Sequence, residues 1–348
     1  MTSLSQIWAI LTISEKKISI LLVMFMFMAM IFEIVGIGAF IPLIAVLIGE
    51  QSSLNLPFFE NIFSNTSNQN NVETIAFFTF FFGFVIIIKN LFLIFSTWFN
   101  SKNLQNLSKR ISYDLFKKYL QAPYFFHTTN NSSKLIYNCT DCTYVFKEAS
   151  GHLIVLLSEL MVLFGISLFL LYLEPRGFLI SSSIMLLISL IYFKINKNRL
   201  FEIGKKIELN EKEKIKSIMQ GLGGIKIIKI LKKENNFINV FNKYNIESNF
   251  YKFLAGFITN LPRFVLEIIV ITFATVTLIF LSLRNIPSTE IFLKASVFGF
   301  AAFRLLPSLN RIISSYEKFR VCKFQINTIY SQINLPYNLD YISINKKK

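Results

Sequence analysis

Six long apolar stretches constrain this chain more than any other feature of its sequence. A helix needs about 20 predominantly apolar residues to cross the hydrocarbon core of a bilayer. Hydrophobic residues make up 53% of the chain and charged residues only 16%, a composition that excludes an ordinary soluble domain. The sequence therefore predicts an all-α membrane protein with six long transmembrane helices, at about Ile18–Ile48, Thr74–Phe99, Gly151–Leu173, Gly177–Phe193, Phe253–Leu283 and Phe292–Ser315.

Two polar segments rich in lysine, 100–150 and 194–252, separate these stretches. The loops on the opposite side hold only Arg176 and Arg284 as basic residues. Because cytoplasmic segments carry an excess of Lys and Arg, both polar segments and both termini are predicted to face the cytoplasm. The predicted organisation is a cytoplasmic N-terminal segment, a six-helix membrane domain and a cytoplasmic tail, over residues 1–17, 18–320 and 321–348.

Four basic residues fall within the apolar stretches, namely Lys89, Arg263, Arg304 and Arg311. A charge at membrane depth costs at least about 2.5–3.5 kcal/mol, so its presence calls for a partner or a function. From the rise per residue, Lys89 and Arg263 lie about 15 Å from the inner ends of their helices and Arg304 about 10 Å. We predict that these four cations line a pathway for an anionic substrate.

A second interpretation of these cations stays open. They can pair inside the protein with carboxylates that also lie in the apolar stretches, namely Glu33, Glu159 and Glu267. Arg311 lies nearest the cytoplasmic boundary and can extend its guanidinium to the headgroups.

The remaining residue types predict no catalytic or metal site. Cys139 and Cys142 form a lone CxxC pair without a second pair, and the only two histidines are His127 and His152. The net charge of +16 is spread between the apolar stretches, so it does not indicate nucleic-acid binding. Membrane lipids are the partners that the composition itself implies.

Four stretches together resemble a known family. They read FEIVGIGAFIPLIAVL at 32–47, YLQAPYFFHTTNNSSKLIYNCT at 119–140, MQGLGGIKIIKILKKENNF at 219–237 and FRLLPSLNRIISSYEKFR at 303–320. They are similar to the transmembrane domain of exporter-type ABC transporters. Within that class they are closest to the flippases for lipid-linked oligosaccharides, which serve bacterial protein N-glycosylation and surface-polysaccharide export.

The resemblance implies a function and a set of partners. The chain would flip a polyprenyl-pyrophosphate-linked oligosaccharide across the bacterial inner membrane, as a homodimer or with a sister subunit. An exporter of peptide or another lipid, or a truncated remnant that transports nothing, are the alternatives. The cations in the membrane would attract the pyrophosphate, because guanidinium groups donate paired hydrogen bonds to phosphate oxygens.

The resemblance also assigns residues that couple the membrane domain to an ATPase. The turns of the two cytoplasmic segments would dock into the ATPase through His127, Asn131, Ser132, Ser133, Ser217, Gln220 and Gly221. In the first segment we expect a helix break at Ala122-Pro123 and a turn at 130–133.

The chain departs from the family in one respect. Members continue into an ATPase domain, whereas this sequence contains no GxxxxGKS or GxxxxGKT motif. The glycines at 221, 223 and 224 lack the spacing of a phosphate-binding loop. The chain is therefore expected not to be an enzyme by itself. ATP and magnesium would be bound by a partner ATPase, encoded separately or lost by truncation.

Overall fold

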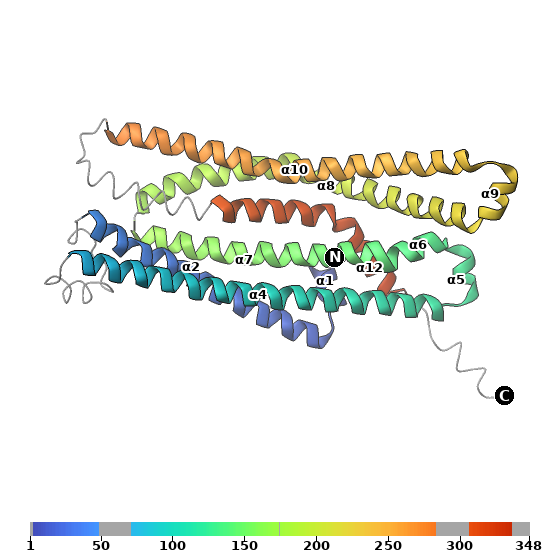
Figure 1. Ribbon diagram of the computed structural model, residues 1–348, viewed down its shortest axis with the longest axis horizontal. Helices are drawn as coiled ribbons and strands as arrows, with labels where there is room; N and C mark the ends of the chain where they lie inside the picture. The colour runs from blue at the N-terminus through green and yellow to red at the C-terminus, as the bar shows by residue number, and fades with distance from the viewer. Residues whose placement is uncertain (1–2, 49–70, 174, 283–305, 336–348) are drawn as a thin grey trace.

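A computed structural model describes residues 3–48, 71–173, 175–282 and 306–335, and every regular element in these ranges is helical (Figure 1). The predicted all-α class is therefore confirmed for this part of the chain. Residues 306–321 are also helical. The other elements are α1 (Ser3–Ile10), α2 (Ile13–Ile48), α4 (Asn71–Gln121), α5 (Tyr124–Thr129), α6 (Ser132–Tyr137), η1 (Asn138–Cys142), α7 (Thr143–Leu173), α8 (Pro175–Gly223), α9 (Ile225–Leu231), α10 (Glu234–Ser282) and α12 (Lys323–Ile333).

Three helical segments of the described residues are long and apolar enough to span a membrane: Ile13–Phe40, Ala76–Gln121 and Ser132–Phe169. They overlap the first three predicted spans. The fourth and fifth fall on α8 and α10, whereas much of the sixth lies outside the described residues, so the count of six stays a prediction. α8 and α10 have 49 residues each, a length of about 73 Å. Each is far longer than a bilayer core is thick and so projects beyond it.

The long helices run side by side, and α5 and α9 lie at the same end of the molecule, on the right of Figure 1. The expected break is confirmed, because α4 ends at Gln121 and α5 begins after Pro123. Proline lacks the amide hydrogen that a continuing helix needs. The expected turn is confirmed as well, since the Asn131 side chain accepts a hydrogen bond from the Ser133 amide and caps α6.

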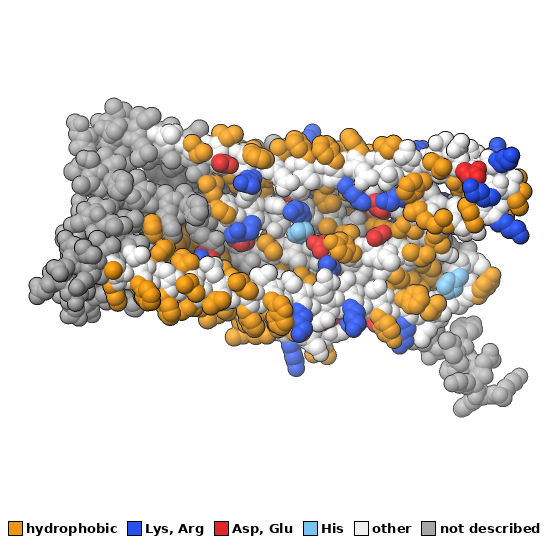
Figure 2. All heavy atoms as spheres, in the orientation of Figure 1, with side chains coloured by type: hydrophobic (Ala, Val, Ile, Leu, Met, Phe, Trp, Pro, Cys, Tyr) orange, Lys and Arg blue, Asp and Glu red, His pale blue; other side chains and the backbone are white. Residues whose placement is uncertain are grey.

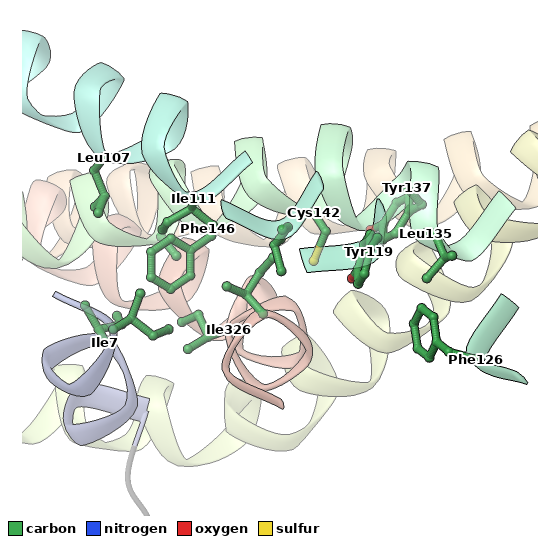
Figure 3. Packing of buried hydrophobic residues seen from close by; sticks show 14 residues of the cluster. Ile7, Leu107, Ile111, Tyr119, Phe126, Leu135, Tyr137, Cys142, Phe146 and Ile326 are labelled. Atoms are coloured by element: carbon green, nitrogen blue, oxygen red, sulfur yellow. The ribbon is translucent and has the colours of Figure 1, made fainter. Parts of the chain in front are cut away.

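The largest apolar core lies near the end that carries α5, not at membrane depth. It joins residues of α1, α4, α6, η1, α7 and α12, among them the fully buried Ile111, Phe146 and Ile326 (Figure 3). At membrane depth, by contrast, α4 exposes side chains such as Phe80 and Ile94, and Figure 2 shows apolar side chains covering that part of the surface. This distribution follows from the solvent, because lipid accepts apolar side chains that water excludes.

Part of the predicted tail is packed into this core. After residue 321 the chain turns, and α12 lies against α1, α7, α8 and η1. The turn brings two backbones together, since a Cβ added to Gly204 of α8 would lie 2.0 Å from the Val321 carbonyl oxygen. Only glycine allows such an approach.

Candidate functional site

Lys89 is placed at membrane depth between α2 and α4, and it is paired. Its Nζ lies 3.3 Å from Oε2 of Glu33, whose side chain is only 3% exposed. The ammonium group of Lys89 and the carboxylate of Glu33 therefore neutralise each other in a place with little access to water. This contact agrees with the second interpretation of the sequence, in which the cations pair inside the protein.

Arg311 is paired in the same way, with a carboxylate of α7. Its Nε donates to Oε1 of Glu159 at 2.5 Å, and its Nη2 donates to Oε2 at 3.3 Å. The Ser308 hydroxyl donates to the same Oε2 at 2.6 Å. The carboxylate therefore ties residues 306–321 to α7, while the Arg311 side chain stays partly exposed.

Arg263 differs from these two cations. It lies on α10, next to Pro262, and its side chain is exposed. Within the described ranges no ion pair joins it to Glu267 or to another carboxylate. Arg304 lies outside the described residues. Of the three predicted cations that the structure describes, two are therefore paired with carboxylates, and the role of all four in a pathway stays a prediction.

The tip of the first lysine-rich segment is formed by α5 and the turn that follows it. Tyr124 and Phe125 are 82% and 76% exposed. His127 Nε2 lies 3.0 Å from the Tyr119 carbonyl oxygen, which only accepts, so this nitrogen donates. Of the other predicted coupling residues here, Asn131 and Ser132 are exposed, whereas Ser133 is buried.

The tip of the second lysine-rich segment is α9, which begins beyond the residues predicted to couple. Ser217 is buried, Gln220 is exposed and Gly221 is half-buried. Apolar side chains of α9 and its flanks are exposed to solvent, including Leu222, Ile227, Ile230 and Leu231. Basic side chains lie among them in the sequence. Figure 2 shows basic side chains at this end of the molecule. α9 ends at Lys232, which adopts a left-handed backbone conformation.

α8 and α10, which carry the second tip, are tied together by one carboxylate. Glu211 of α8 accepts hydrogen bonds from Ser248 and Lys252 of α10, at 2.5 and 2.6 Å, and from Lys214 at 2.9 Å. Burial alone would raise the pKa of Glu211, but these three donors outweigh it and lower the pKa to about 2. The Glu211 carboxylate is therefore ionised throughout the neutral range.

α12 is bonded to both lysine-rich segments, which no pattern in the sequence indicated. Gln332 accepts a hydrogen bond from the Tyr119 hydroxyl at 2.9 Å, and Asn138 donates to that hydroxyl at 3.1 Å. On the other side, the Thr328 hydroxyl donates to Glu208 of α8 at 3.0 Å. Polar residues in a lysine-rich segment look like a solvated surface, so no pattern could have placed them in a core.

No group of three or more His, Cys, Asp or Glu residues suited to a metal occurs among the residues that the structure describes. The cysteines at 139, 142 and 322 are all free thiols, and Cys142 is buried.

The comparison with protein families gives one match. Residues 27–291, well over half of the chain, match the family described as the ABC transporter transmembrane region.

Proposed function

The chain belongs to the ABC transporter transmembrane region family, and from that membership we propose that it is the membrane-spanning part of an exporter driven by a partner ATPase. Membrane regions of this family generally pair with ATPase domains and dimerise. One observation carries the proposal for this chain: both cytoplasmic tips, α5 and α9, lie at the same end of the molecule (Figure 1). A single partner surface at that end can therefore engage both.

The chemistry of the tips supports a protein partner. Tyr124 and Phe125 on α5, and Ile227 and Ile230 on α9, expose apolar surface on helices that project beyond the bilayer. Exposed apolar patches in water mark interaction sites. ATP and magnesium would be bound by the partner. This chain would transmit the motion from α5 and α9 to the helices in the membrane.

Crosslinking tests the docking. Cysteines introduced as Phe125→Cys and Ile230→Cys should crosslink to the ATPase subunit in membranes that contain both proteins. Asn249→Cys, an exposed position on the α10 shaft, is the matched control and should not crosslink. If all three positions react alike, or if Phe125→Cys and Ile230→Cys stay free during transport, the proposal fails.

For the cargo we propose a polyprenyl-pyrophosphate-linked oligosaccharide, moved outward across a bacterial inner membrane with both termini in the cytoplasm. Its support comes from Arg263, which is exposed at membrane depth and has no ion pair among the described residues. A guanidinium at that depth is costly without an anion, and pyrophosphate supplies one. Arg304, which lies outside the described residues, would add a second cation.

Flipping of that lipid in proteoliposomes with the ATPase tests the cargo. Arg263→Lys should reduce the rate and Arg263→Glu should reduce it further, because the first loses the paired donors and the second repels phosphate. Lys243→Glu makes the same charge change as Arg263→Glu, on an exposed position of α10 near the cytoplasmic tip, and should keep the rate. Equal rates for wild type and Arg263→Glu would exclude this cargo site.

A second copy is the partner that we propose for α10. Its large apolar side chains recur at spacings of three, four or seven residues along one exposed stripe: Ile246, Phe250, Phe253, Phe257, Phe264, Ile268 and Ile271. This is the spacing by which helices pack against each other. Lipid can cover the upper part of the stripe, but Ile246 and Phe250 precede the predicted span and need protein. Phe250→Lys should therefore reduce the dimer fraction at equal expression.

An exporter of peptide or another lipid remains the second candidate, favoured by the paired state of Lys89 and Arg311. Two of the four predicted cations are already neutralised by carboxylates, which leaves less positive charge for a pyrophosphate.

A further inference from the structure

A cavity of about 660 Å³ lies beside α1, where this short helix crosses the ends of α2, α4 and α7. Its walls are mostly apolar and include Trp8 of α1, Leu22 and Met26 of α2, Leu104 of α4 and Leu157 of α7. The volume falls within the range of small-molecule sites in proteins. None of the residues assigned to the cargo pathway or to the coupling tips lines it.

The cavity lies at the predicted inner boundary of the spans: its residues on α2 and α7 reach into the predicted spans, and those on α4, at 100–107, lie just beyond Phe99. Along α2 it extends from Glu15 to Met26, eleven residues or about 16 Å. Half of a hydrocarbon core of about 30 Å is about 15 Å. Its deep end adjoins side chains of α2 that face the lipid, such as the exposed Val23 and Phe27. A lipid chain can therefore enter sideways from the bilayer.

Basic and aromatic side chains mark the headgroup level, and one of the aromatic rings, Trp8, lines the cavity. Lys16 lies over the ring of Trp8 and Lys102 over the ring of Trp98, at 5.5 and 4.9 Å from the ring centroids. These are the only two tryptophans of the chain. Tryptophan and lysine gather at the membrane–water interface. Lysines between membrane helices on the cytoplasmic side attract anionic headgroups.

The cavity wall also holds an unsatisfied polar atom. Oδ1 of Asn100, a residue that lines the cavity, is buried and has no hydrogen-bond partner. A buried polar atom left without a partner is destabilising. The Oδ1 atom is closed off from the cavity, so a ligand there would meet other polar groups of the wall. Asn103 and Ser150 also line the cavity.

We propose that this cavity binds one phospholipid of the cytoplasmic leaflet. A hydrocarbon chain of the lipid lies between α2 and α7, along Leu22, Met26 and Leu157. The phosphate lies at the level of Lys16 and Lys102, which favours an anionic headgroup such as phosphatidylglycerol. The bound lipid fixes α1 against the membrane helices, because α1 supplies one wall and the lipid fills the space behind it.

Fluorescence quenching by brominated phosphatidylglycerol tests the site in the full-length chain, purified in detergent. The variant Trp98→Phe leaves Trp8 as the only tryptophan, and Trp8 forms part of the cavity wall. Titration should quench Trp8 in a saturable way, with one lipid per chain. Quenching that rises linearly without saturation would mean that lipid only surrounds the protein, and would overturn the proposal.

Two matched variants in that background separate the cavity from the outer surface. Ser19→Phe places a ring inside the cavity, since Ser19 lines it, and should weaken binding at least tenfold. Ser101→Phe adds the same ring on the exposed face of α4 and should leave binding unchanged. Equal binding by both variants would overturn the proposal. If Ser19→Phe does not fold, Leu157→Phe replaces it with the same expectation.

The headgroup assignment has a separate test. Brominated phosphatidylcholine should bind several-fold more weakly than phosphatidylglycerol, and Lys16→Gln should remove that difference. Equal affinity for both lipids in the unsubstituted chain would show that the lysines do not select the headgroup, and would overturn the anionic preference.

Discussion

Glu211→Gln should loosen the contact between α8 and α10, the pair of helices that carries α9. The carboxylate is nearly buried and bonds three donors, two of them on α10. Lowering its pKa from 4.5 to about 2 corresponds to about 3 kcal/mol of preference for the charged form in the folded state. Lys252 is about half exposed and recovers hydration when the charge is lost. We therefore expect a loss of about 2–3 kcal/mol in the local stability of α8 against α10.

Hydrogen exchange measures that loss. Amides of α10 around Ser248 and Lys252 should exchange about 30- to 100-fold faster in Glu211→Gln than in wild type, as 1.4 kcal/mol is tenfold. Glu213→Gln is the matched control. Glu213 pairs only with the partly exposed Lys216, at 3.1 Å, and such surface pairs contribute little. Equal exchange in the two variants would refute the role given to Glu211.

The same carboxylate predicts a dependence on pH. Its pKa is lowered in the folded state, so its stabilising contribution is complete above about pH 4.5 and is lost as the pH falls toward about 2. Exchange of α10 amides, corrected for the intrinsic rate, should therefore accelerate between pH 5 and pH 3 in wild type. Glu211→Gln should lack that acceleration.

Three further changes probe the contacts between helices. Gly204→Ala should lower the melting temperature, because the added methyl would lie 2.0 Å from a backbone carbonyl oxygen and would push α12 out of the core. Lys89→Met or Glu33→Gln alone should each cost about 3–5 kcal/mol by removing one partner of a buried ion pair, and the double variant should recover part of it in a thermal-shift assay. Exchanging the charges, Arg311→Glu with Glu159→Arg, should restore membrane abundance lost in Arg311→Glu alone; recovery of transport as well would exclude Arg311 from the pathway.

Local chemistry made the helix boundaries predictable. Pro123 stops α4 because it cannot donate to the helical ladder, and Asn131 caps α6 with its own side chain. Apolar length gave the first three spans for the same reason, since it is a property of the segment alone. Each of these features depends on residues that are neighbours in the chain.

Tertiary contacts were not predictable in this way. The sequence placed Lys89 and Arg311 at membrane depth, but which carboxylate each would meet depends on how helices distant in the chain are rotated and shifted against each other. The burial of Ser217 and the packing of α12 also depend on how distant helices are rotated and shifted against each other. Gly204 could not be told apart from other glycines in the sequence. It is needed because the backbone at Val321 packs against it, and not because Gly204 forms a turn.

The contacts of α12 determine how the two tips can move. Through Tyr119 and Gln332, α12 is bonded to the end of α4 that leads into α5. Through Thr328 and Glu208 it is bonded to α8, which leads into α9 and is tied to α10 by Glu211. A displacement of α9 relative to α5 must therefore stretch or break one of these two sets of bonds. Close-packed interiors resist small shifts and change between discrete arrangements. We therefore expect α12 to make the two tips move together until one set of bonds breaks, and we expect breakage of the Glu208–Thr328 bond to free α8 and α10 as a unit.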